Sequence, residues 1–242
     1  MSMWMDISLQ ALMILGSVIM YLWIHNIPRK LLAKYQLYRD RSLHQSRRHF
    51  VKAAELVNKA RSYPRSSPSS LSFAAAAAAE AEAAVRLYPA DAANHVVRAL
   101  ALDLQGYKTS ALEAIEAALS PLAVSSLSDD EKADALVKRA ELRMEVSRLG
   151  NSEGVDEAVW RKVEEELTEA VALKRESERG WCLLGECCEG LGKTEKAKEA
   201  FEEAVRVQPD SVAAKHGLER AEELRANATS DSREETESRA RG

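Results

Sequence analysis

The chain has 242 residues and a net charge of −4, and only 5% of its residues are aromatic. This length allows one or two domains, and the abundance of Ala, Glu, Leu, Lys and Arg with few Gly and Pro favours helices over sheets. Residues 1–50 carry seven basic residues against two acidic ones, a net charge of +5, which leaves −9 for the remainder. An acidic body repels nucleic acid, so the sequence predicts no nucleic-acid partner.

The N-terminal segment 7–27, after a short flank at 1–6, is strongly apolar. No charged residue lies between Ile7 and Ile24, and about 20 apolar residues suffice for a helix to span a bilayer. A cleaved signal peptide is the alternative, but Asp6 stands where a basic n-region is expected, and no A-x-A cleavage site follows. The sequence therefore predicts a transmembrane helix over 7–27.

A basic segment follows, and residues 28–45 are predicted to form a juxtamembrane helix beginning at Pro28. Positive charge on this side of the apolar segment predicts a single-pass membrane protein with an N-terminal anchor. Its C-terminal domain would lie in the cytosol, at the ER or an organelle outer membrane. The basic side chains either contact anionic membrane lipid or only fix the topology. The candidate lipid-headgroup ligands are Arg29, Lys30, Lys34, Arg39 and Arg41.

The strongest pattern in the chain lies at 178–210, where small and large apolar residues alternate at fixed spacings. Gly185 and Ala197 are small where two antiparallel helices would cross, and larger side chains fill the seam between them. The full set is Trp181, Leu184, Gly185, Gly192, Ala197, Phe201, Ala204 and Pro209. This pattern resembles the tetratricopeptide repeat, a helix–turn–helix unit of about 34 residues. The resemblance implies a stacked array that binds other proteins, and it argues against an enzyme.

The same pattern recurs 86 residues earlier, as the step from Gly106 to Gly192 shows. His95 and Ala99 there replace Trp181 and Gly185. Other pairs at this offset are Ala111 with Ala197, Ala114 with Ala200, Glu116 with Glu202 and Ala118 with Ala204. The offset continues upstream, where residues 51–56 pair with 137–142. We therefore predict an internal duplication in which each half contains two helical hairpins.

The first hairpin of each half departs from the family spacing. The steps from Ala54 to Ala99 and from Ala140 to Gly185 are each 45 positions, against an expected repeat of about 34. The additional residues lie at 62–72 and 148–157, where Pro, Ser and Gly favour loops. The helix after the first of these loops is predicted to begin at Ser72, before a run of alanines.

The predicted fold is therefore all-α. It is a tetratricopeptide-like solenoid of about four helical hairpins plus a capping helix, with an N-terminal transmembrane helix. The array spans 46–226, with hairpins at about 46–90, 92–120, 130–176 and 178–210 and a cap at 211–226. The polar segment 227–242 lacks large apolar residues and is predicted to be a disordered tail.

In tetratricopeptide proteins the first helices of successive repeats line a concave groove, and the resemblance places candidate partner-binding residues there. Some members clamp the C-terminal carboxylate of chaperone tails with Lys and Asn, but the positions here are mostly acidic, which disfavours a chaperone tail. A basic or amphipathic peptide or helix of a protein partner fits better, unless these carboxylates only solvate a helical face. The candidates are Val51, Glu55, Asn58, Val96, Leu100, Asp103, Val137, Glu141, Glu145, Cys182, Glu186 and Glu189.

Two functions remain open. The leading hypothesis is a membrane-anchored scaffold or adaptor that docks a cytosolic protein, or a membrane-complex subunit, through the groove. The alternative is a structural or membrane-remodelling factor that acts through the basic segment and self-association. The three cysteines fit no zinc spacing, and no phosphate-binding loop, nucleophile elbow or H-E-x-x-H motif is present. We therefore predict no catalytic residues, no metal site and no cofactor.

Overall fold

The structure is a computed structural model that describes residues 2–24, 27–150 and 157–225. Its described side chains are those of residues 7, 9–18, 20–21, 41–150 and 157–225. The helices are α1 (Ser2–Ile24), α2 (Ile27–Arg61), α3 (Pro68–Leu87), α4 (Ala92–Leu104), α5 (Lys108–Ala118), η1 (Val124–Ser126), α6 (Asp129–Gly150), α7 (Glu157–Leu173), α8 (Glu178–Gly190) and α9 (Thr194–Val207). Residues 212–225 form a further helix. The predicted tail at 227–242 lies outside the described residues.

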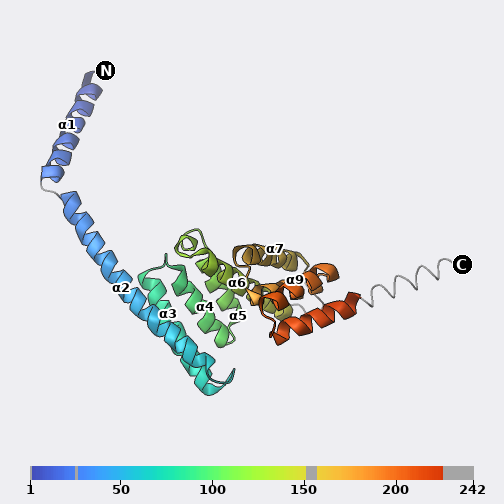
Figure 1. The fold of residues 1–242 in the computed structure, drawn as a ribbon. Coiled ribbons are helices and arrows are strands. Elements are labelled where there is room, and N and C mark those ends of the chain that lie inside the picture. Colours follow the sequence, from blue (N-terminus) through green and yellow to red (C-terminus); the bar gives the residue numbers. More distant parts are fainter. Residues whose placement is uncertain (1, 25–26, 151–156, 226–242) are drawn as a thin grey trace.

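The helices pair into four hairpins that stack side by side (Figure 1). The hairpins are α2/α3, α4/α5, α6/α7 and α8/α9, and helix 212–225 packs on the last of them. The second helix of each hairpin also contacts the first helix of the next one. The prediction of an all-α, tetratricopeptide-like array of four hairpins with a closing helix is thus confirmed for the part of the chain that the structure describes.

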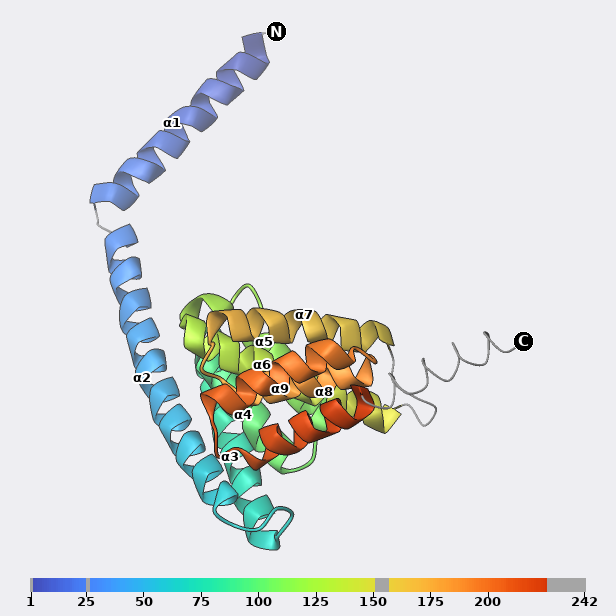
Figure 2. The same ribbon diagram turned by 45° about the vertical axis from the view of Figure 1, so that its right-hand side comes forward.

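Helix α2 is long enough to belong both to the array and to the segment before it. The predicted division between residues 45 and 46 falls inside this continuous helix, and its N-terminal half extends away from the array together with α1 (Figure 2). Ser46, which is 1% exposed, joins α2 to the array. Its Oγ donates to the carbonyl of Ala84 at 3.0 Å and accepts from Nδ2 of Asn94 at 3.0 Å. These bonds connect α2, α3 and α4.

The prediction of a membrane-spanning helix at 7–27 is wrong. Helix α1 covers most of this segment, but among the described residues no helix is long and apolar enough to cross a membrane. A bilayer core requires about 20 predominantly apolar residues, and the exposed Gln10 and Ser17 lie among the apolar residues of α1. The predicted localisation, a single-pass protein anchored at the ER or an organelle outer membrane, is corrected accordingly.

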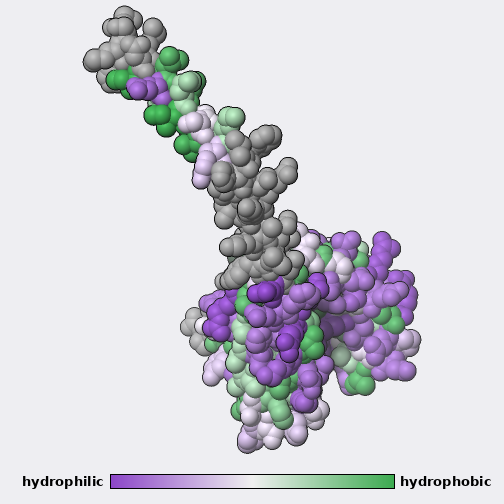
Figure 3. Space-filling view, turned by 90° about the vertical axis from the view of Figure 1, so that its left-hand side faces the viewer, coloured by the Kyte–Doolittle hydropathy of each residue, from purple (hydrophilic) through white to green (hydrophobic). Residues whose placement is uncertain are grey.

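The surfaces of α1 and of the array differ in character. Figure 3 shows mainly hydrophobic residues on the described part of α1, and mainly hydrophilic residues over the array. The large apolar side chains of α1 are exposed, and Leu12, Met13 and Ile14 are exposed by 60% or more. The array instead buries clusters of apolar residues between its helices, and these clusters follow the hairpins.

The loop between α2 and α3 is shorter than predicted. Helix α3 begins at Pro68 and not at Ser72, because Ser67 caps it: the Ser67 Oγ accepts a hydrogen bond from the backbone N–H of Ser70 at 3.2 Å. Proline suits the first helical position, where a missing N–H costs nothing. Ser70 is buried, and its Oγ donates to the carbonyl of Ala60 at 2.9 Å. The residues predicted as the end of the loop therefore already form the first turn of α3.

The core supports the predicted duplication. In the second half the ring of Phe201 lies so close to Gly185 that a Cβ there would be 2.6 Å from it. In the first half the equivalent residues are Ala99 and Ile115, both fully buried. Alanine is larger than Gly185 and isoleucine is smaller than Phe201, so the two changes compensate. The turns match as well. Gly106 and Gly192 have φ angles of +85° and +70°, a conformation that glycine adopts without steric cost.

We expect Gly185→Ala to destabilise the protein by about 1–3 kcal/mol, because the new methyl group overlaps the Phe201 ring. Combining it with Phe201→Ile recreates the Ala–Ile pair of the first half and should cost less than the sum of the two single changes. The measurement is urea unfolding followed by circular dichroism for the wild type, both single variants and the double variant. Strict additivity would show that the two side chains do not compete for the same space.

Candidate functional site

A hollow of about 440 Å³ touches the first helix of every hairpin. We call it the central hollow. Leu100, Asp103 and Leu104 of α4 form part of its wall, and Lys138 and Glu141 of α6 face it from the next hairpin. The remaining lining residues are Ala60, Arg61, Tyr63, Arg65, Ser70 and Arg179. A surface to which all four hairpins contribute exists only when the array is stacked.

The carboxylates of the central hollow are held in ion pairs. Asp103 is 7% exposed and lies 2.5 Å from Nζ of Lys108 and 2.6 Å from Nζ of Lys138. Glu141 is 14% exposed, accepts from Lys138 at 3.1 Å and pairs with Arg179 of α8. Burial alone would raise the pKa of Asp103, but the hydrogen bonds from the two lysines outweigh burial and lower it. The two lysines therefore favour the ionised form of Asp103, and Glu141 is paired with Lys138 and Arg179.

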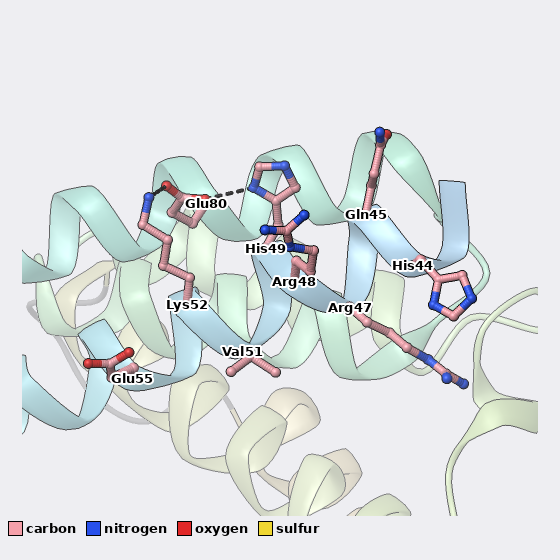
Figure 4. Close-up of a pocket in the computed structure, with 9 residues that line it drawn as sticks. All are labelled: His44, Gln45, Arg47, Arg48, His49, Val51, Lys52, Glu55 and Glu80. Carbon is pink, nitrogen blue, oxygen red and sulfur yellow. Dashed lines mark hydrogen bonds and ion pairs between the residues drawn. The ribbon is translucent and has the colours of Figure 1, made fainter. Parts of the chain in front are cut away.

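A second hollow, of about 880 Å³, lies along α2 and α3 nearer the N-terminus. We call it the N-terminal hollow. His49 Nδ1 and Lys52 Nζ converge on the carboxylate of Glu80, the former at 2.7 Å, while Arg47 extends away from that carboxylate (Figure 4). Hydrogen bonds from Lys52 and His49 lower the pKa of Glu80. The other lining residues are His44, Gln45, Arg48, Val51 and Glu55.

The structure brings together only some of the predicted groove residues. Leu100, Asp103 and Glu141 meet in the central hollow, and Val51 and Glu55 line the N-terminal hollow. Asn58 is exposed on α2, between the two hollows in sequence. The remaining predicted residues line neither hollow: Val96, Glu145, Glu186 and Glu189 are half-buried, and Val137 and Cys182 are buried.

Basic residues are the part of the site that the sequence analysis missed. Arg61, Arg65, Lys138 and Arg179 line the central hollow, and among the described residues none forms an ion pair with Arg61 or Arg65. Lys138 directly follows the predicted Val137, so the sequence could have predicted that Lys138 lies on the same first helix. The sequence could not have predicted that Lys138 pairs with Asp103, because the two residues are 35 positions apart and meet only when the hairpins stack.

The predicted lipid ligands fall mostly outside the described side chains. This holds for Arg29, Lys30, Lys34 and Arg39, whose backbone belongs to α2. Arg41 is described and exposed. Within the described residues, no group of three or more His, Cys, Asp or Glu side chains could hold a metal ion.

The three cysteines are packing residues inside the last hairpin. Cys182 lies in a cluster with Ala204 and Ala214, and Sγ of Cys187 contacts the carbonyl of Trp160 at 3.3 Å. Burial raises the pKa of Cys182 and Cys187 to about 12 and that of Cys188 to about 11. All three thiols are therefore protonated at neutral pH and shielded from reagents.

We expect the native protein to react very slowly with Ellman's reagent at neutral pH, because the reactive thiolate is scarce and the sulfur atoms are buried. All three thiols should react rapidly once urea unfolds the chain. The absorbance of the released thiolate gives both rates. Rapid reaction of the folded protein would contradict the burial of this hairpin.

Asp103→Asn should lower the free energy of unfolding by about 1–3 kcal/mol at neutral pH, because Lys108 and Lys138 lose a shared charged acceptor. The folded pKa of Asp103 lies below its ordinary 3.8, so its ionised form stabilises the fold above about pH 4. That stabilisation is lost as the pH falls through the folded value. The difference in the free energy of unfolding between wild type and Asp103→Asn should therefore become smaller at acidic pH.

Urea unfolding at a series of pH values measures this gap. Asp134→Asn serves as the control, because the ion pair of Asp134 with Lys174 is exposed and contributes little. A gap for Asp103→Asn that stays constant from neutral to acidic pH would exclude the titration of this carboxylate as its source.

Residues 178–211, which contain α8 and α9, match a family model described as tetratricopeptide repeat. No curated protein matches the sequence significantly. Among solved structures, that of MamA protein is 15% identical, with a TM-score of 0.54, and the match covers 74% of this chain and 83% of that one. A structure from the functional characterization of Pseudomonas aeruginosa pilF is 18% identical, with a TM-score of 0.55, over 76% and 68% of the two chains.

A third similar structure is that of Cut9 with Hcn1 from the APC/C, which is 12% identical with a TM-score of 0.52 and covers 62% of this chain and 27% of that chain. At these identities the likeness establishes the fold. The family assignment comes from the last hairpin, where the family model and the Gly185–Phe201 packing coincide. Residues 178–211 therefore carry a tetratricopeptide repeat, and the described hairpins before them share the fold of tetratricopeptide-like arrays.

Proposed function

We propose that this protein is a scaffold that docks a segment of a partner protein in its central hollow. The observation that carries the proposal is that all four hairpins contribute their first helices to this one hollow. A stacked tetratricopeptide array is a binding surface that no single hairpin possesses. The fold is typical of protein-interaction scaffolds that carry no catalytic activity of their own.

The shape and lining of the central hollow favour a short peptide or one face of a helix. Leu100 and Leu104 supply half-buried apolar contacts, and Arg61 and Arg65 supply exposed donors at the rim. Such a mixture suits an amphipathic segment, whose apolar side chains enter the hollow while its polar ones remain at the edge. Because Asp103 and Glu141 are bound to lysine and arginine, they do not offer a free acidic wall to a basic partner.

The proposal is tested by proximity labelling in cells with Arg61→Glu/Arg65→Glu. Both arginines are exposed and without a described ion-pair partner, so the fold should tolerate the change. We expect the variant to lose labelled proteins that the wild type acquires, because reversed charge at the rim disrupts docking.

Lys162→Glu/Lys215→Glu is the matched control. It makes the same change in net charge at exposed positions of α7 and helix 212–225, away from both hollows. Circular dichroism confirms that both double variants are folded. An identical set of labelled proteins for the wild type and Arg61→Glu/Arg65→Glu would refute docking in the central hollow.

A further inference from the structure

One exposed stripe of α2 connects the two hollows. Arg47, Val51, Asn58 and Arg61 are all exposed, and their steps of four, seven and three residues place them on one face of the helix. Arg47 lines the N-terminal hollow and Arg61 the central hollow. At 1.5 Å per residue, the two arginines lie about 20 Å apart along the helix axis. This length matches a few turns of a bound helix or a short extended peptide.

The arginines at both ends of the stripe have no ion-pair partner among the described residues. No described residue forms an ion pair with Arg47 or Arg48 at one end, or with Arg61 at the other. Two acidic residues lie on or beside the stripe, and both are paired: Glu55 with Lys59 at 2.8 Å, and Glu80 with His49 and Lys52. The stripe therefore offers guanidinium groups whose donors are not used within the described part of the molecule.

We propose that the α2 stripe, from Arg47 to Arg61, binds an acidic segment of a partner protein. The inference rests on the proposed docking function and specifies the charge of what is docked. Arginine presents a planar fork of donors that matches a carboxylate in a bidentate pair. Val51, which is 62% exposed in the N-terminal hollow, gives an apolar contact next to those forks. The segment thus carries carboxylates near its ends and an apolar residue between them.

A protein segment fits this surface better than an anionic lipid layer does. The arginines share their hollow with the carboxylates of Glu55 and Glu80, so the hollow does not form the continuous positive surface that favours an anionic lipid layer. On a peptide whose carboxylates lie near its ends, those carboxylates can meet Arg47 and Arg48 while an uncharged middle part passes Glu55. The hollow also continues the same face of α2 toward the central hollow, so one peptide can occupy both.

The test uses the full-length protein and a fluorescein-labelled peptide with glutamates at both ends and leucines between them. Fluorescence anisotropy measures the affinity of wild type, Arg47→Glu/Arg48→Glu, Arg47→Lys/Arg48→Lys and the control Lys162→Glu/Lys215→Glu. A peptide with glutamine in place of glutamate tests the need for charge. Vesicles containing phosphatidylserine test the lipid alternative.

We expect Arg47→Glu/Arg48→Glu to bind the acidic peptide about tenfold or more weakly than wild type, because two charge-assisted contacts become repulsive. The lysine variant should lose less, since it keeps the charge but not the fork. The control should bind as the wild type does, added salt should weaken binding, and the glutamine peptide should bind poorly.

Three results would each overturn the inference. These are equal affinity of wild type and Arg47→Glu/Arg48→Glu, equal affinity for the glutamine and glutamate peptides, and arginine-dependent binding to the vesicles without binding to the peptide. The proposed docking function is judged separately. If Arg61→Glu/Arg65→Glu changes the partners labelled in cells while the acidic peptide fails to bind, that result supports docking in the central hollow and contradicts the binding of an acidic segment to the α2 stripe.

Discussion

The stacking of one hairpin on the next is the constraint on which this molecule depends. Phe201 shows it most clearly, because its ring meets Gly185 in its own hairpin and Gly217 in helix 212–225, where added Cβ atoms would lie 2.6 and 2.3 Å away. A single side chain therefore forms the seam inside one hairpin and the contact with the element that follows. A hairpin taken alone would lose the contact of this ring with helix 212–225, so its apolar face is fully buried only in an array.

Ion pairs also join consecutive units of the array. Asp103 lies near the end of α4 and pairs with Lys138 of the next hairpin. Its equivalent at the 86-residue offset, Glu189, lies near the end of α8 and pairs with Arg220 of helix 212–225 at 2.9 Å. In both halves the carboxylate that ends a first helix thus binds a cation of the following unit. Acidic residues at these positions join neighbours and are not free for a partner.

This use of carboxylates also explains where unpaired cations remain. Lys138 and Arg179 each pair with a carboxylate of the hairpin before their own, Asp103 of α4 and Glu141 of α6. Helix α2 belongs to the first hairpin of the described residues, and no carboxylate among those residues pairs with Arg47 or Arg48. The acidic groups within reach on α2 and α3 are taken by Lys59, His49 and Lys52. A basic stripe at the start of the array is the consequence.

The sequence by itself determined the helical hairpins, their number and their duplication. Small residues such as Gly185 and Ala197, and the paired turn glycines Gly106 and Gly192, set local geometry that periodicity reveals directly. The start of α3 was also encoded, in the Ser67–Pro68 cap, but the alanine run after Ser72 gave the stronger helical signal. The membrane anchor was predicted from an apolar segment with basic residues after it, and the structure has no helix in its described residues that is long and apolar enough.

Only the tertiary structure decided the character of the binding surface. Spacing along the chain placed Asp103 and Glu141 on first helices and suggested acidic walls. It could not show that Lys138, 35 positions after Asp103, closes onto that carboxylate, or that Arg179 reaches Glu141 from the last hairpin. Ion pairs depend on distances between separate helices, and these distances exist only after stacking. The repeat pattern is local, so the sequence predicts it. The charge of the proposed binding surface depends on which side chains have no ion-pair partner once the hairpins have stacked.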